Sequence, residues 1–210
     1  MDKVNTIIEI LKERYPDSLC ALGYEKDYEL MIAVRLAAQC TDARVNLITP
    51  ALFARFPSLE AFATADVREV EDYIHSCGFF RQKAKDIVEA CGILLTEHGG
   101  KVPDDMDTLL KLPGVGRKTA NLLLGDLYGQ PAVVCDTHCI RIANRLGLAK
   151  GKEPEKVERQ LRAILPPEES NDFCHRIVLF GREVCTARSP KCEICPLRPH
   201  CSSSTGEQDG

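Results

Sequence analysis

Four cysteines crowd into the last part of the sequence, with the spacing Cys185-x6-Cys192-x2-Cys195-x5-Cys201. Four thiolates at such short intervals suit either a tetrahedral zinc ion or a [4Fe–4S] cluster. Structural zinc sites usually contain two close cysteine pairs, whereas only Cys192 and Cys195 form one here. The spacing therefore favours an iron–sulfur cluster over zinc. The other seven of the eleven cysteines are scattered, mostly among apolar neighbours, which is typical of buried free thiols.

A second candidate site is the segment Leu112-Pro113-Gly114-Val115-Gly116-Arg117-Lys118, which lies between two expected helices. Two glycines one residue apart permit a tight turn with positive φ and a close approach of the backbone to a ligand. The helix that follows directs its free N–H groups and positive dipole end at this turn, which suits a DNA phosphate. The glycines alone are equally compatible with an ordinary corner between two helices. Lys118 lies in the first turn, where the dipole and Arg117 favour the free, nucleophilic amine over the ammonium.

Asp136 follows Lys118 by 18 residues and precedes Thr137 and His138 at the expected start of another helix. An aspartate at this position is typical of an N-cap, which stabilises a helix by about 1 kcal/mol. A capping carboxylate is held in a fixed orientation, so the capping role is compatible with a second role for the same residue.

The segments LPGVGRKTAN and VCDTH and the four-cysteine cluster occur in an order and spacing that resemble the endonuclease III family. Members of this family are bifunctional DNA glycosylase/AP lyases of the helix-hairpin-helix superfamily. The resemblance extends from the N-terminal helix to Cys201 and implies an all-α helix-hairpin-helix glycosylase fold. It implies a six-helix barrel domain at residues 20–129, with the helix-hairpin-helix at about 107–128. Residues 1–19 and 130–201 would form a helical iron–sulfur domain, and residues 202–210 a flexible tail.

The resemblance also implies a mechanism. Lys118 would attack the sugar C1′ and form a Schiff base, and β-elimination would then cleave the strand 3′ to the abasic site. Asp136 would activate the lysine and stabilise positive charge that develops on the sugar. Related adenine glycosylases without lyase activity lack this lysine, so Lys118 argues for the bifunctional reaction. The [4Fe–4S] cluster would be held by Cys185, Cys192, Cys195 and Cys201.

Further DNA contacts are implied along the hairpin, at the helix after Asp136 and at two segments that would open the duplex. An enzyme that acts on C1′ must flip the nucleotide out of the helix, and side chains are expected to fill the gap. Gln39 in LAAQCTD matches the plug of the family, and Phe79 in SCGFFRQKA matches an apolar wedge that is usually leucine. Lys83 and Lys85 are expected on a solvated helix face. The expected DNA-binding residues are Gln39, Phe79, Leu112, Gly114, Val115, Gly116, Arg117, His138 and Arg141, of which His138 could instead be structural.

We therefore expect a base-excision repair enzyme that removes damaged, oxidised pyrimidines from double-stranded DNA and cleaves abasic sites. Two alternatives remain: a mismatch-specific thymine or uracil glycosylase on the same scaffold, and a non-catalytic iron–sulfur DNA-binding module. The expected partner is double-stranded DNA with damaged bases or abasic sites, bound by a monomer.

The elements that must position these residues are helical, because apolar residues recur with helical periodicity and no stretch alternates as a strand does. About ten helices are expected, with start signals at Asp27, Thr41 or Asp42, Ser58 and Asp66. A long helix is expected over residues 83–98, ending at two glycines. We expect Pro50 to break its helix or begin a new one, and residues 131–135 are the one strand-like stretch.

Composition sets limits on the class of protein. The chain has 210 residues, 44% of them hydrophobic, and a net charge of −4, which excludes a polybasic DNA binder. The segments 111–145 and 176–201 nevertheless each carry five Lys and Arg against two Asp and Glu, as a phosphate-facing surface requires. No apolar signal region or membrane span is expected, so we expect a cytoplasmic protein, associated with the nucleoid in a prokaryote.

Overall fold

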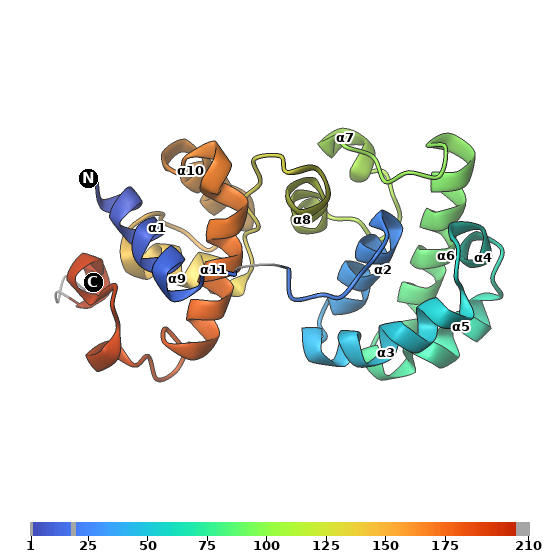
Figure 1. The fold of residues 1–210 in the computed structure, drawn as a ribbon, viewed down its shortest axis with the longest axis horizontal. Helices are drawn as coiled ribbons and strands as arrows, with labels where there is room; N and C mark the ends of the chain where they lie inside the picture. The colour runs from blue at the N-terminus through green and yellow to red at the C-terminus, as the bar shows by residue number, and fades with distance from the viewer. Residues whose placement is uncertain (1, 18–19, 205–210) are drawn as a thin grey trace. The chain divides into compact units, whose positions relative to one another are not determined.

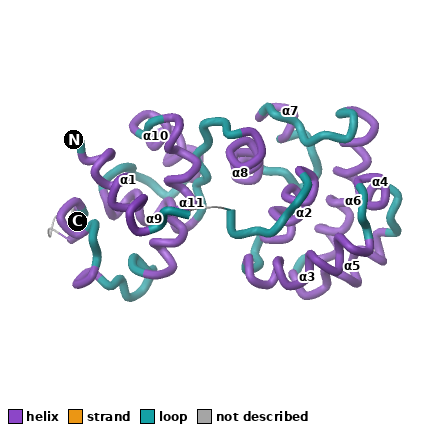
Figure 2. Tube along the Cα trace, in the orientation of Figure 1, coloured by secondary structure: helices purple, strands orange, loops and turns teal. Residues whose placement is uncertain are grey.

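The structure is a computed structural model that describes residues 2–17 and 20–204. Within these residues all regular elements are helices and no strand is present, so the all-α prediction is confirmed (Figure 2). The α-helices, labelled in Figure 1, are α1 (Lys3–Arg14), α2 (Asp27–Ala37), α3 (Asp42–Arg55), α4 (Leu59–Ala63), α5 (Val67–Ile74), α6 (Phe80–Glu97), α7 (Met106–Leu109), α8 (Arg117–Tyr128), α9 (Thr137–Leu146), α10 (Pro154–Ile164) and α11 (Ser170–Glu183). Short 3₁₀ turns follow or connect them: η1 (His75–Cys77), η2 (Pro167–Glu169), η3 (Cys192–Ile194), η4 (Arg198–His200) and η5 (Ser202–Ser204).

The chain divides into two compact units, and the first segment of the chain belongs with the last. We call residues 20–128 the hairpin unit, because it contains α7, α8 and the glycine turn between them. Residues 2–17 together with 129–204 form the cluster unit, because it contains the four clustered cysteines.

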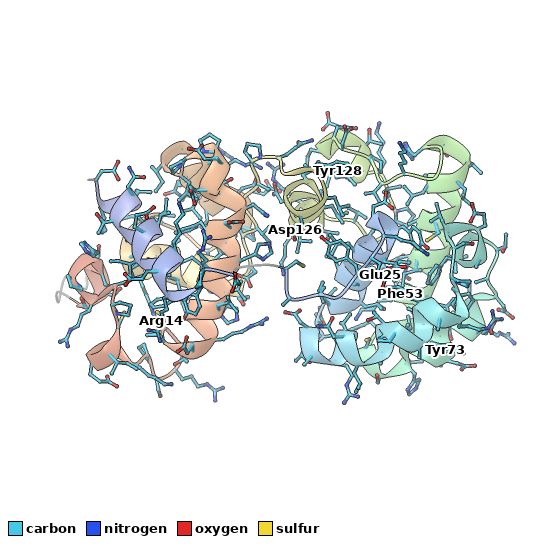
Figure 3. All side chains as sticks on the ribbon, in the orientation of Figure 1. Arg14, Glu25, Phe53, Tyr73, Asp126 and Tyr128 are labelled. Atoms are coloured by element: carbon cyan, nitrogen blue, oxygen red, sulfur yellow. The ribbon has the colours of Figure 1, made fainter. Side chains whose placement is uncertain are left out.

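Helix α2 lies in the core of the hairpin unit, and most of its residues are buried. Leu30, Ile32 and Leu36 are all completely buried, as expected for a helix that is apolar on nearly every side. The rings of Tyr28 on α2, Phe53 and Phe56 surround Phe62, with centroid distances of 6.3, 6.2 and 5.1 Å. Phe53, on α3, is labelled in Figure 3. This packing joins α2, α3 and α4.

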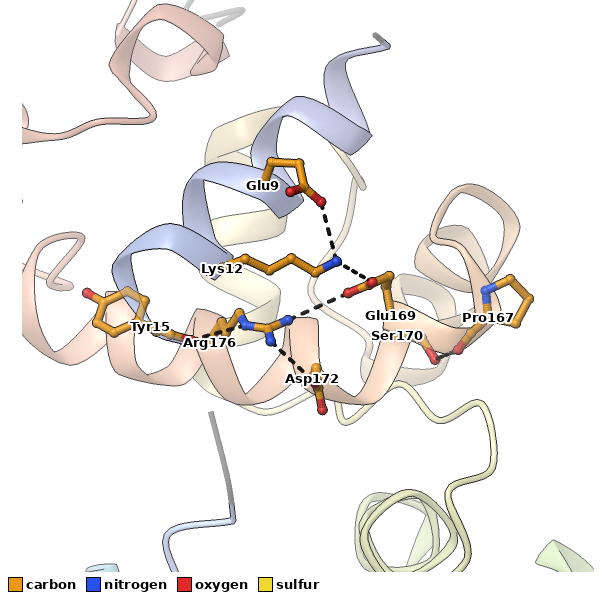
Figure 4. Close-up of polar contacts among 8 residues, drawn as sticks. All are labelled: Glu9, Lys12, Tyr15, Pro167, Glu169, Ser170, Asp172 and Arg176. Carbon is orange, nitrogen blue, oxygen red and sulfur yellow. Dashed lines mark hydrogen bonds and ion pairs between the residues drawn. The ribbon is translucent and has the colours of Figure 1, made fainter. Parts of the chain in front are cut away.

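In the cluster unit, α1 packs its apolar face, Ile7, Ile8 and Leu11, into the core, and polar contacts join it to α11. Figure 4 shows Lys12 of α1 paired with Glu169, whose other carboxylate oxygen lies 3.6 Å from Nη1 of Arg176. The Nε of Arg176 also donates to the carbonyl of Tyr15 at 3.3 Å. The N-terminal helix is therefore an integral part of the cluster unit.

Two expectations about local structure are corrected. Pro50 neither breaks a helix nor begins one, because α3 runs through it. The carbonyl that Pro50 leaves without a donor is that of Asn46, which is exposed, so water can solvate it, while Val45 and Leu52 anchor the helix on either side. The strand-like residues 131–135 form a loop instead, since no second extended segment among the described residues pairs with them and Val134 N–H donates to the Cys174 thiol.

Of the expected tail, residues 202–210, the structure describes only the first three residues. Ser202–Ser204 form η5, in which the Ser204 hydroxyl donates to the carbonyls of Arg198 and Cys201 at 2.8 and 2.9 Å. Residues 205–210 lie outside the described residues. None of the helices in the described part of the chain is long and apolar enough to cross a membrane.

Candidate nucleic-acid interface and metal centre

The glycine turn is built by one of its two glycines. Gly114 has a φ of +74°, and a Cβ there would lie 2.4 Å from Nε of Arg35 and 2.9 Å from Oδ2 of Asp86. Gly116 does not have positive φ, and a Cβ there would meet no atom within 4 Å. Gly114 is therefore required by the fold, while Gly116 leaves the outside of the turn open to a ligand.

Under the turn lies an ion pair that sequence reasoning missed. Arg35 of α2 contacts Oδ2 of Asp86 of α6 through Nη2 at 2.6 Å and through Nε at 2.8 Å, and Gln82 donates to Oδ1 at 2.7 Å. Both charged side chains are largely shielded from solvent, so each needs the other. The signal available in the sequence was an arginine within an otherwise apolar helix.

The side chains of the hairpin divide into anchors and exposed groups. Leu112 and Val115 are buried, and Val115 N–H donates to the carbonyl of Leu112 at 3.1 Å, which closes the turn. Arg117 and Lys118 are exposed at the beginning of α8. The first turn of a helix has N–H groups without intrahelical partners, so this end of α8 suits an anion beside the Lys118 amine.

Gln39 and Phe79 are the two non-glycine residues with positive φ among the described residues, at 56° and 47°. Gln39 follows α2 and is exposed, and Phe79 precedes α6 with 70% of its surface exposed. Phe80, by contrast, is partly buried and stacks on His75 with a centroid distance of 4.5 Å. Of the two adjacent aromatic side chains, Phe79 is thus the one available for insertion.

The expectation that Lys83 lies on a solvated face is wrong. Its side chain is buried, and its ammonium donates to the carbonyls of Leu36 and Cys77 at 2.9 and 2.7 Å. Two carbonyl oxygens replace the water that a lysine normally binds, which allows the charge to be buried. Lys85 on the same helix is exposed, as expected.

Asp136 is the N-cap of α9, as the sequence predicts, and its Oδ1 accepts a hydrogen bond from Cys139 N–H at 2.7 Å. The half-buried His138 has a pKa lowered by burial, an effect that the nearby charges of Arg141 and Arg182 reinforce and that of Asp136 opposes. Arg141 donates to the carbonyls of Gly181 and Cys185 at 3.2 and 3.0 Å, so its contact with phosphate stays a prediction.

The four clustered cysteines line one cavity of about 300 Å³ in the cluster unit. The surrounding chain is a series of tight turns in which Arg198 N–H donates to Cys195 O and Cys201 N–H to Arg198 O. Arg145, Lys191 and Arg198 also line the cavity and would offset the negative charge of four thiolates. This set of sulfur donors around one space fits a [4Fe–4S] cluster. Among the described residues, no group of three or more His, Cys, Asp or Glu side chains is placed to hold a single metal ion.

Arg145 is a further residue that the sequence did not indicate. Its Nη1 donates to Sγ of Cys185 at 3.2 Å and to the carbonyl of Thr186 at 2.8 Å, and its Nη2 donates to Ala187 O at 3.0 Å. The Arg145 carbonyl accepts from the Cys201 thiol at 3.3 Å. One residue of α9 thus joins the first and last cysteines of the cluster segment. Only its position, one turn after Arg141, distinguishes it in the sequence.

Comparison with known families identifies two matching regions. Residues 32–167 match the HhH-GPD superfamily of base excision DNA repair proteins, and residues 185–201 match the iron–sulfur binding domain of endonuclease III. Among individual proteins, endonuclease III of Synechocystis sp. is 46% identical over 203 residues, covering 96% of this chain and 93% of that protein. Endonuclease III of Escherichia coli K12 is 40% identical, covering 93% and 92%.

Solved structures give the same result. A trapped endonuclease III–DNA covalent intermediate superposes with a TM-score of 0.91 at 39% identity, covering 98% of both chains. A non-covalent endonuclease III–DNA complex has the same TM-score and identity. A thermostable thymine-DNA glycosylase reaches a TM-score of 0.84 at 22% identity, a likeness that shows the fold alone.

Proposed function

Because the chain belongs to the endonuclease III family of the HhH-GPD superfamily, we propose that Lys118 and Asp136 are the catalytic residues of its reaction. The family identifies the protein as a base-excision repair DNA glycosylase/AP lyase that carries a [4Fe–4S] cluster. The observation that carries the assignment of the nucleophile is the position of Lys118, exposed in the first turn of α8 directly after the Gly114 turn.

In this reaction the lone pair of the Lys118 amine attacks C1′ of the damaged nucleotide, and the base leaves with the electrons of its glycosidic bond. The nitrogen then loses a proton, and the C1′–O4′ bond of the sugar ring breaks with its electrons passing to O4′. The product is a Schiff base between Lys118 and the opened sugar. β-Elimination then breaks the bond 3′ to the abasic site. Asp136, held in place by the Cys139 N–H, activates the amine by accepting its proton, and in its carboxylate form it stabilises positive charge on the sugar.

The hairpin binds phosphate through its backbone. Since the side chains of Leu112 and Val115 are buried, these residues contribute backbone groups, and Gly116 allows the strand to approach closely. Gln39 and Phe79 enter the duplex beside the extruded nucleotide. The substrate we propose is double-stranded DNA with an oxidised pyrimidine, bound by a monomer, and association with the nucleoid stays a prediction.

Cys185, Cys192, Cys195 and Cys201 are the proposed ligands of the cluster, supported by the cavity that they line. When bound, the cluster supplies a rigid cross-link within the segment 185–201. Arg145 orients Cys185 through its hydrogen bond to the sulfur.

Borohydride reduction tests the assignment of the nucleophile, because it converts a Schiff base into a stable bond between protein and DNA. We expect wild-type protein to form this adduct with a duplex that contains an abasic site or thymine glycol, and to form less with a G·T mismatch. Lys118→Gln should form none, whereas Lys101→Gln, which changes an exposed lysine of the same unit, should react as wild type does. An adduct that persists in Lys118→Gln would assign the nucleophile to another residue.

A further inference from the structure

One buried ammonium connects two segments of the hairpin unit that are far apart in the sequence. The Lys83 side chain, with 1% of its surface exposed, donates to Leu36 O, 47 residues earlier, and to Cys77 O, six residues earlier. Burial lowers the pKa of Lys83, and the neighbouring thiols of Cys77 and Cys40 oppose this effect. A buried charge needs compensating dipoles, so the two carbonyls cannot move away from Lys83 independently.

The two carbonyls stand just before the two residues proposed to enter DNA. Leu36 lies three residues before Gln39, and Cys77 lies two residues before Phe79. These are the two non-glycine residues with positive φ among the described residues, a conformation that residues with a Cβ adopt only when their surroundings impose it. The backbone N–H of Lys83 also donates to Phe79 O at 3.1 Å.

The side chains themselves provide no such connection. Gln39 and Phe79 are both exposed to solvent. In the described part of the chain, no hydrogen bond or ring contact joins their side chains. The separation of the two turns is therefore set by the backbone beneath them, where the Lys83 ammonium contacts both.

We infer that Lys83 is a positioning residue for duplex opening, because its ammonium holds the Gln39 and Phe79 turns at a fixed separation so that both side chains enter the DNA together. This inference rests on the proposed function and adds a residue that contacts neither the sugar nor the base. Lys83 would act on the step that extrudes the nucleotide and not on the chemistry at C1′.

The test separates duplex opening from the reaction of an accessible sugar. Lys83→Met keeps the length of the side chain and removes its charge and donors, and Lys85→Met makes the same change at an exposed position of α6. Single-turnover rates are measured on a thymine glycol duplex and on a single-stranded abasic oligonucleotide, which needs no opening. We expect Lys83→Met to react about tenfold or more slowly on the duplex and at nearly the wild-type rate on the single strand. Lys85→Met should match wild type on both.

A second measurement tests whether Lys83 acts through the two turns. In a Gln39→Ala/Phe79→Ala background, Lys83→Met should cause no further loss on the duplex, because there is nothing left to position. Fluorescence of 2-aminopurine beside the lesion should rise more slowly in Lys83→Met than in wild type. If Lys83→Met does not fold, Lys83→Gln, which retains a donor, is measured in the same way.

Three results would overturn the inference. They are an unchanged duplex rate in a folded Lys83 variant, an equal loss on both substrates, and a full additional loss in the double-alanine background. These results all require an active wild-type protein. A wild-type chain that fails to cleave even the single-stranded abasic site contradicts the proposed function itself, so the two failures are distinguishable.

Discussion

At Gly114 the backbone turns with a φ of +74°, and the space that a Cβ would occupy is filled by Arg35 Nε and Cδ and by Oδ2 of Asp86. The substitution Gly114→Ala combines an unfavourable backbone conformation with the displacement of a shielded ion pair. We expect it to lower the free energy of unfolding by about 1–3 kcal/mol and to weaken DNA binding, measured by urea denaturation and fluorescence anisotropy.

Gly92 provides the matched control, because it lies inside α6 and a Cβ there would meet nothing within 4 Å. Gly92→Ala should therefore raise the free energy of unfolding by up to about 1 kcal/mol, as is usual for this change within a helix. Equal effects of the two substitutions would show that the ion pair under Gly114 does not restrict the turn.

Lys83 shows why residue-level sequence reasoning has a limit. A lysine in the first turn of an amphipathic helix is usually solvated, and nothing in its neighbours distinguishes Lys83 from Lys85. The partners of Lys83 are backbone carbonyls, one of them 47 residues away. Every residue has a backbone carbonyl, so residue types cannot indicate such partners. The Arg35–Asp86 pair, 51 residues apart, was equally out of reach. The nucleophile and the cluster cysteines could be proposed because their chemistry depends on residue type and short spacing.

At the scale of elements, α9 and α11 cross closely where α11 has a glycine. A Cβ on Gly181 would lie 2.5 Å from Nδ1 of His138 and 2.9 Å from Cδ1 of Ile142. The imidazole is therefore enclosed between two helices, which accounts for its lowered pKa.

This enclosure predicts a pH dependence of stability. A histidine with a lowered pKa in the folded state contributes stability above its unfolded pKa, about 6.5, and that contribution is lost as the pH falls through the folded pKa. In thermal melts from pH 7.5 to 5, wild type should therefore lose stability relative to His138→Gln. Parallel curves for the two proteins would show that His138 titrates alike in both states.

Elements were predictable where the side chains that fix them are close in sequence. The caps at Ser58, Asp66 and Asp136 accept hydrogen bonds from N–H groups two or three residues later, so the local sequence was enough to predict them. The prediction of a break at Pro50 was wrong because packing can keep a helix intact through a proline. Val45 before Pro50 and Leu52 after it are both buried and hold α3 in place. Residues 131–135 looked like a strand because a short apolar run is as typical of a buried loop as of a strand.

At the scale of the whole molecule, the cluster should stabilise one unit far more than the other. Removing it by oxidation and chelation frees the segment 185–201, which Arg145 joins to α9. We expect hydrogen exchange to quicken in that segment, in α9 and in η5, and to remain slow in α2 and α6. Iron and sulfide analysis before and after treatment confirms the removal, and stoichiometric zinc without iron would exclude the cluster.

The hairpin unit serves as an internal reference for this prediction, because its hydrogen exchange is measured in the same molecule. Equal quickening in α2 and α9 would contradict the prediction and show that both units unfold as one cooperative body.

The cluster unit is assembled from both ends of the chain, which has a consequence for its synthesis. Lys12 and its partner Glu169 are 157 residues apart, so at ribosomal rates α1 is made about 10–30 s before α11. During that interval the hairpin unit can fold, whereas Ile7, Ile8 and Leu11 have no completed core to enter. A nascent chain thus presents this apolar face to chaperones until its last helices are made. Helix α1 is thus made before α11 but can complete its packing only after α11 has been made.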